Sequence, residues 1–111
     1  LVSSFHIREI NPNLVISNSL RVAFWSLLKS LTDIYAKNNI TTINIAPGPI
    51  DTDRIRNLNN DIQKLKDKLP LKRLGKTDEI GELVKNIVLK DIKYINGTTI
   101  FMDGGKSKTL F

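Results

Sequence analysis

A first group of side chains able to move a proton or bind an anion lies before residue 22. His6 is the only histidine in the chain, and histidine exchanges a proton near neutral pH. It follows Ser4 by two residues. Asn18 and Arg21 are three residues apart, so a helix would place them on roughly one face, where Arg21 could bind a carboxylate or phosphate through two hydrogen bonds. The plainer alternatives are a solvated histidine, a serine that caps the backbone, and an arginine in a surface or subunit-interface ion pair.

A second group follows a β-rich segment, residues 40–46, which is bounded by Pro47-Gly48-Pro49. Proline cannot continue the hydrogen-bond ladder of a strand, so the strand is predicted to end there. Open α/β sheets bind ligands in loops that leave the carboxyl ends of parallel strands. Gly48 would let a ligand approach the backbone closely, although a plain strand-ending turn has the same composition.

Hydrophobic periodicity predicts two helices. Residues 14–38 carry apolar side chains at helical spacing on more than one side, which indicates deep burial or packing against another subunit. A second helix is expected to begin at Thr77, whose hydroxyl would cap it before Asp78 and Glu79 in the first turn. Between the two helices, residues 53–69 are polar with apolar residues three or four apart, which is typical of a mobile amphipathic lid.

Three β-rich segments alternate with these helices, at residues 1–4, 40–46 and 97–102. Strands that alternate with helices predict an α/β fold with a parallel sheet and right-handed crossovers. Two helices would cover one face of three strands, whereas a doubly wound, Rossmann-type sheet has helices on both faces. We therefore expect residues 1–111 to form a single partial domain, the C-terminal half of such a sheet.

Composition argues against several classes of protein. The chain has no cysteine, so it has no disulfide framework and no thiolate zinc site, and we expect no metal. The net charge is +6, but the lysines are spread without a dense basic run, so nucleic-acid binding is not expected. No apolar run approaches the ~20 residues that cross a bilayer, and no signal peptide is visible. We expect no membrane association and a cytoplasmic location.

Two stretches taken together resemble the short-chain dehydrogenase/reductase family. The first is IAPGPIDT, from Ile45 to Thr52, which contains the family's Pro-Gly-x-x-x-Thr. The second is LPLKRLGKTDEI from Leu69 to Ile80, followed by INGTT from Ile95 and DGG from Asp103. These pieces are specific in this order, and the resemblance covers essentially the whole chain. It implies the last three strands of a seven-stranded parallel sheet, with the glycine-rich cofactor turn outside these residues.

The resemblance also implies a proton donor that this chain lacks. The family places a tyrosine and a lysine four residues apart on the long helix, and a serine at the end of the fifth strand. The matching positions here are Leu14, Asn18 and Ser4. Leucine cannot donate a proton, and asparagine can hydrogen-bond a ribose hydroxyl but supplies no positive charge. The candidate catalytic residues are therefore Ser4, Asn18 and Arg21, with His6 as a substitute donor.

The cofactor implied by the resemblance is NAD or NADP. The side that meets the nicotinamide would consist of Pro47, Gly48, Ile50 and Thr52, with the Ile50 backbone and the Thr52 hydroxyl bonded to the carboxamide. The substrate would be a small carbonyl compound or alcohol, covered by the 53–69 lid. The long helix and the last strand would pair copies of the chain into a homodimer or homotetramer.

Two functional hypotheses remain open. In the first, the parent protein is an NAD(P)-dependent oxidoreductase and residues 1–111 are its C-terminal portion, which alone would be inactive. In the second, the protein is a catalytically impaired pseudoenzyme that serves in oligomerisation or nucleotide binding. Leu14 and Asn18 favour the second hypothesis.

Overall fold

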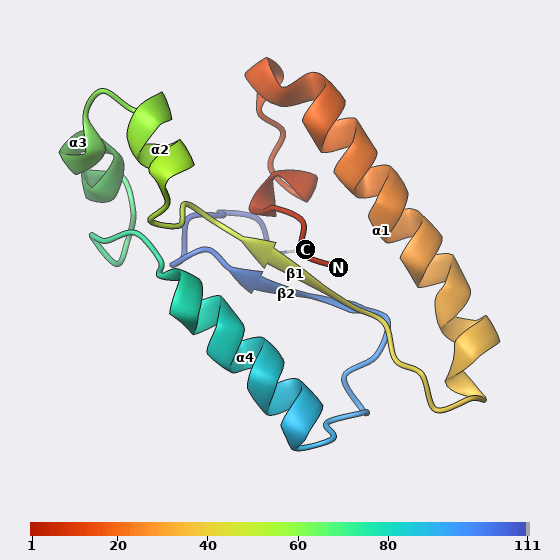
Figure 1. Cartoon of the computed structure of the whole chain (residues 1–111). Coiled ribbons are helices and arrows are strands. Elements are labelled where there is room, and N and C mark those ends of the chain that lie inside the picture. Colours follow the sequence, from red (N-terminus) through yellow and green to blue (C-terminus); the bar gives the residue numbers. More distant parts are fainter. Residues whose placement is uncertain (111) are drawn as a thin grey trace.

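The computed structural model describes residues 1–110 and shows two parallel strands between two long helices (Figure 1). The main elements are α1 (Val15–Ala36), β1 (Ile43–Pro47), α4 (Thr77–Leu89) and β2 (Thr98–Met102). The lid between β1 and α4 contains two short helices, α2 (Asp53–Leu58) and α3 (Ile62–Asp67). Two 3-10 helices, η1 (Phe5–Ile7) and η2 (Pro12–Leu14), precede α1. The predicted α/β fold with a parallel sheet is confirmed.

The two strands pair in register from Ile43 opposite Thr98 to Pro47 opposite Met102. Pro47 is therefore the last residue of β1, one residue beyond the predicted end, a position where the missing N–H is tolerated. Asn44 is fully buried in β1, and its Nδ2 donates to Oγ1 of Thr99 on β2 at 3.2 Å. This side-chain bond adds to the parallel ladder.

The N-terminal segment lies alongside β1 but forms only one parallel bridge, from Val2 to Ile45. Its backbone bonds are Ser3 N–H to the Ile45 carbonyl and Ile45 N–H to the Leu1 carbonyl, each 2.8 Å. The prediction of a strand at residues 1–4 was therefore right in place and direction. The ladder ends at Ser3, and the backbone turns into η1 at Phe5, directly after the predicted segment.

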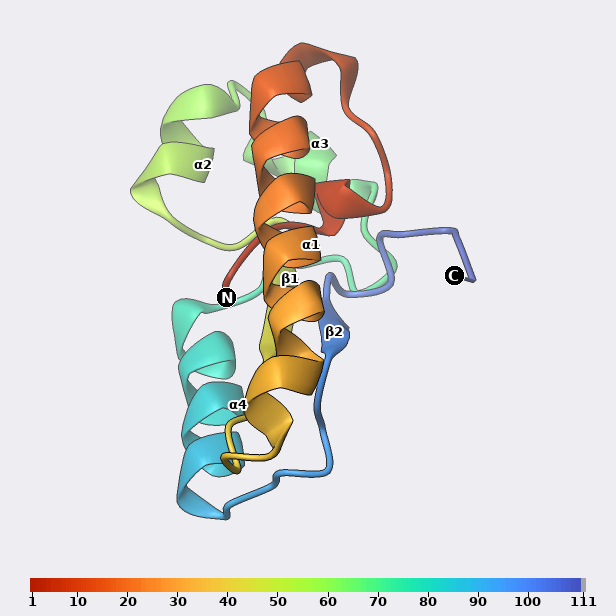
Figure 2. The same cartoon turned by 90° about the vertical axis from the view of Figure 1, so that its right-hand side faces the viewer.

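The two long helices lie on opposite sides of the strands (Figures 1 and 2). We had expected both to cover one face, and that expectation was wrong. Residues 1–3, β1 and β2 lie side by side in this order. Because α1 and α4 connect them in the same direction from opposite faces, the two crossovers cannot both be right-handed, although the right hand is strongly preferred.

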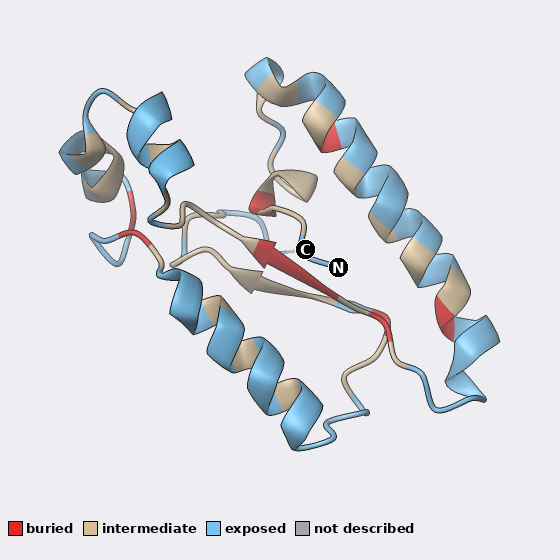
Figure 3. Ribbon diagram, viewed as in Figure 1, coloured by how far each residue is buried: buried red, intermediate tan, exposed pale blue. Residues whose placement is uncertain are grey.

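Burial is concentrated at β1 and at the segment after the lid, as Figure 3 shows. The buried apolar residues are Phe5, Ile45, Ala46, Leu69 and Leu74. The lid contains two short helices rather than one continuous helix, because Asn59 is extended and the Asp61 side chain accepts from Lys64 N–H to begin α3. After α1, Asn39 adopts φ 61°, the left-handed conformation that asparagine tolerates just beyond a helix end.

Candidate active site

A cleft of about 440 Å³ opens beside the start of the loop that follows β1. It lies between η1, α1, the lid and the chain after β2. Its apolar lining comes mainly from Phe5, Leu14, Ile55, Leu58 and Leu65, and its polar lining from Ser4, His6, Asn11, Ser17, Arg21, Arg54, Asn59 and Lys106. The cleft therefore combines apolar walls with convergent polar groups, which is the usual composition of a small-molecule site.

Ser4 and His6 both line this cleft. The Ser4 Oγ accepts from the backbone N–H of His6 at 3.3 Å, so this serine caps η1. His6 Nδ1 lies 3.0 Å from the Glu9 carbonyl oxygen. Since a carbonyl only accepts, Nδ1 carries the proton, which leaves Nε2 as the second nitrogen for proton exchange. The capping role expected as the alternative for Ser4 is present, and its hydroxyl hydrogen remains available to donate.

Leu14 and Arg21 also line the cleft, and Asn18 lies between them on α1. Asn18 is buried, with its Nδ2 donating to the Asn11 carbonyl at 3.0 Å. Its buried Oδ1 has no hydrogen-bond partner among the described residues. A guanidinium N–H of Arg21 donates to Ser17 Oγ. Asn18 therefore fixes η2 against α1. Leu14 and Asn18, at the family's tyrosine and lysine positions, present no acidic proton to the cleft.

The loop after β1 is held by the segment around Gly75. Gly75 N–H donates to the Pro49 carbonyl at 3.0 Å, and Asp51 N–H donates to the Gly75 carbonyl at 2.8 Å. These bonds flank Ile50 and form a parallel bridge, so the N–H and C=O of Ile50 point away from Gly75. Within residues 1–110, neither of these Ile50 backbone groups has a hydrogen-bond partner.

Thr52 stands at the end of the loop and caps α2. Its Oγ1 accepts from Ile55 N–H at 3.3 Å, which leaves the hydroxyl hydrogen free to donate. A primary carboxamide carries both N–H donors and a C=O acceptor. The Ile50 carbonyl and N–H, together with the Thr52 hydroxyl, form a complementary donor and acceptor set, so the residues present fit the carboxamide of a nicotinamide.

Gly48 is required for a different reason from the one expected. A Cβ on Gly48 would lie 2.7 Å from Cα and 3.1 Å from the carbonyl oxygen of Asp103. Gly48 N–H also donates to the Met102 carbonyl at 3.0 Å. The close approach at Gly48 is therefore made by the turn after β2, which fastens the two strand ends together.

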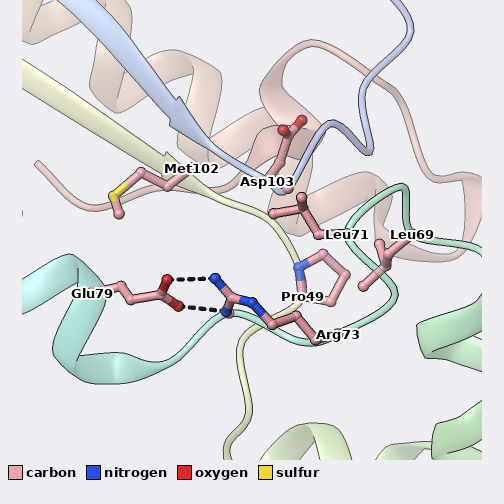
Figure 4. Close-up of a pocket in the computed structure, with 9 residues that line it drawn as sticks. Pro49, Leu69, Leu71, Arg73, Glu79, Met102 and Asp103 are labelled. Carbon is pink, nitrogen blue, oxygen red and sulfur yellow. Dashed lines mark hydrogen bonds and ion pairs between the residues drawn. The ribbon is translucent and has the colours of Figure 1, made fainter.

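An ion pair that the sequence motifs did not reveal lies next to this loop (Figure 4). Arg73 donates from two nitrogens to the two carboxylate oxygens of Glu79, at 2.7 and 2.8 Å. Glu79 Oε2 also accepts from Lys76 N–H at 2.8 Å. The Arg73 guanidinium and then the Lys76 N–H lower the pKa of Glu79 to about 2. The acid in the first turn of α4, rather than the expected Thr77, thus caps that helix.

Arg73 links this cap to the loop. It donates to the Leu74 carbonyl at 3.1 Å, immediately before the Gly75 bridge to Ile50. The ion pair borders a small cavity of about 150 Å³ with Pro49, Leu71 and Met102. The sequence places Arg73 six residues before the capping acid Glu79, so an ion pair between them could have been predicted. Only the fold shows that this pair lies next to the Gly75 bridge and so supports Ile50.

Within residues 1–110, no group of three or more His, Cys, Asp or Glu side chains is placed to hold a metal ion. Over the same residues, no helix has both the length and the apolar character needed to cross a bilayer.

Parallel strands with helices on both sides, and a cleft beside the loop that follows a strand, define a Rossmann-type α/β protein. Residues 1–107 match the family described as enoyl-(acyl carrier protein) reductase. With this match, the chain belongs to the short-chain dehydrogenase/reductase family, an oxidoreductase family, as its motifs predicted.

Curated relatives agree with this assignment. Nodulation protein G of Azospirillum brasilense is 38% identical over 78 residues, which are 69% of this chain and 32% of that protein. The 3-oxoacyl-[acyl-carrier-protein] reductase MabA of Mycobacterium tuberculosis is 36% identical over 80 residues, which are 71% of this chain and 32% of that protein. The chain thus spans about a third of the length of these relatives.

Solved structures share the fold. A short chain dehydrogenase family protein from Francisella tularensis superposes with a TM-score of 0.83 and 27% identity, covering 97% of this chain and 50% of that one. YwfH, described as an NADPH dependent reductase involved in bacilysin biosynthesis, superposes with a TM-score of 0.90 over 98% of this chain and 46% of its own. Its identity is 24%, so that likeness concerns the fold alone.

Proposed function

We propose that the protein containing this chain is an NAD(P)-dependent oxidoreductase that reduces a small carbonyl compound or oxidises the corresponding alcohol. The observation that carries the proposal is the unpaired N–H and C=O of Ile50, held by Gly75 on one side and followed by the free hydroxyl hydrogen of Thr52. This loop contributes to the same cleft as Ser4 and Arg21 through Gly48 and Pro49.

When bound, a reduced nicotinamide would supply the hydride to the carbonyl carbon. The residues of this chain orient the ring and manage charge on the carbonyl oxygen. Ile50 and Thr52 hold the carboxamide. Ser4 would donate a hydrogen bond to the oxygen, and His6, when protonated on both ring nitrogens, would deliver the Nε2 proton that completes the alcohol and remain as the neutral Nδ1–H ring. The buried Asn18 positions α1 by its bond to Asn11.

The cofactor contact is tested by replacing Thr52 in the natural gene product. Thr52→Val keeps the shape but removes the hydroxyl, and should raise KM for NADPH or NADH about tenfold, as expected for loss of a hydrogen bond of roughly 1–1.5 kcal/mol. Thr52→Ser retains the hydroxyl and is the matched control, with KM near that of the parent. Equal KM values in all three proteins would contradict the proposed contact.

A pseudoenzyme is the second candidate, and Leu14 favours it. Leu14 lines the cleft at the position where a tyrosine would donate a proton. Replacement of Leu14 by Tyr and Asn18 by Lys should raise carbonyl reduction by 10²- to 10⁴-fold, the range that a positioned general acid contributes, if the natural protein lacks a donor. A natural protein that already reduces carbonyls well would remove this candidate.

We also propose that α1 pairs copies of the chain. Several large apolar side chains of α1 are exposed, among them Leu20, Phe24 and Leu27 at 55–58%. An apolar helix face of this kind supports the expected homodimer or homotetramer. Sedimentation of the natural gene product tests it, since a monomer at micromolar concentration would contradict the pairing.

A further inference from the structure

Three cationic side chains from different parts of the chain line the cleft. Arg21 comes from α1, Arg54 from α2 in the lid, and Lys106 from the segment after β2. No aspartate or glutamate is among the residues that line the cleft. Among residues 1–110, no carboxylate lies within ion-pairing distance of any of these three cations.

The cations that line the cleft differ from their neighbours in having no acidic partner. Arg56 follows Arg54 by two residues and bonds Asp51 at 2.9 Å, whereas Arg54 faces the cleft without an acid. Arg21 uses one guanidinium N–H on Ser17, which leaves further donors of its planar fork. Lys106 is half-buried. The positive charge in the cleft is thus not neutralised by the fold itself.

The rest of the lining is apolar. Leu14, Ile55, Leu58 and Leu65 supply a low-dielectric wall beside the cations. Such a wall strengthens the attraction between a cation and an anion and raises the local concentration of anionic ligands. The cleft is therefore complementary to a molecule with a short apolar body and a negatively charged end.

We propose that the cleft selects a carbonyl substrate that carries an anionic group, a carboxylate or a phosphate, bound by Arg54 and Lys106 with Arg21. This inference rests on the proposed function for the carbonyl and adds the chemical class of the substrate.

The test compares levulinate, a keto acid, with its neutral methyl ester in NMR binding titrations of the natural gene product at low ionic strength. Levulinate should bind roughly tenfold more tightly than the ester, as expected for charge-assisted hydrogen bonds that are partly screened by solvent. The double variant Arg54→Gln/Lys106→Gln should lose this preference. If inorganic phosphate displaces levulinate, the result indicates a substrate that carries a phosphate. If phosphate does not displace levulinate, the result indicates a substrate that carries a carboxylate.

A variant of equal charge provides the control. Lys64→Gln/Lys85→Gln also removes two positive charges, but neither lysine lines the cleft, so the preference for levulinate should remain. Equal affinity for acid and ester, or equal loss of preference in both double variants, would overturn the inference. Binding is measured without turnover. A preserved preference in a protein that transfers no hydride would therefore refute the proposed function and leave the anion site standing.

Discussion

Replacing Gly48 with alanine places a methyl group against the backbone of Asp103. The new Cβ would lie 2.7 Å from Asp103 Cα, and ordinary contact begins at 3.4 Å, so the two strand ends must separate by about 0.7 Å. Backbone atoms cannot rotate away as a side-chain tip can. Overpacking of this kind costs about 1–3 kcal/mol. We therefore expect Gly48→Ala to lower the free energy of unfolding by that amount.

The same displacement reaches the proposed cofactor contact. Gly48 and Ile50 belong to one loop, and Gly48 N–H is bonded to the Met102 carbonyl. A shift of most of an ångström would break a hydrogen bond to the proposed carboxamide site, and loss of one such bond costs roughly 1–1.5 kcal/mol, so the dissociation constant for NADPH should rise roughly tenfold. Urea unfolding and NADPH fluorescence titration of the natural gene product measure the two effects.

Gly81→Ala is the matched control for this substitution. A Cβ on Gly81 meets nothing within 4 Å, and the residue lies inside α4. Alanine in a helix interior is favoured over glycine by roughly 0.5–1 kcal/mol, so this variant should be slightly more stable with unchanged NADPH binding. Unaltered stability and binding in Gly48→Ala would refute the close packing of Gly48 against Asp103.

The remaining prediction concerns pH. The pKa of Glu79 is lowered to about 2 from 4.5 by Arg73, so its ionised form stabilises the fold above about pH 4.5, and this contribution disappears as pH falls toward 2. Glu79→Gln should therefore lower stability at pH 7 and flatten the loss between pH 4.5 and 2 in urea unfolding. Glu82→Gln, which removes an acid from an exposed pair with Lys85, should change stability little. An unchanged acid profile in Glu79→Gln would contradict this role.

The elements of the fold follow from local patterns. The apolar spacing along α1, the asparagine stop at Asn39 and the β-branched residues of β1 and β2 act over a few residues, so the sequence reveals them. Local patterns do not reveal on which side of the sheet each helix lies, because the hand of each crossover is fixed by packing between distant segments. Applied to both crossovers, the right-handed preference predicted the two helices on one face, whereas they lie on opposite faces.

The candidate site divides in the same way. The Leu14 and Asn18 substitutions, and the loop from Pro47 to Thr52, could be read directly from motif positions. The support of Ile50 by Gly75 joins residues 25 positions apart, and the acid-free lining joins α1, α2 and the end of the chain. Only the folded chain brings Arg54 of the lid into one cleft with Arg21 and Lys106.

The central claim is that this loop and cleft serve hydride transfer to a carbonyl. Its most direct test is to incubate the natural gene product with NADPH or NADH deuterated at C4 of the nicotinamide and with levulinate, and to analyse the alcohol by mass spectrometry. We predict deuterium at the former carbonyl carbon, at a rate that falls in Thr52→Val. Saturable cofactor binding without any labelled alcohol, for either acid or ester, would contradict the claim.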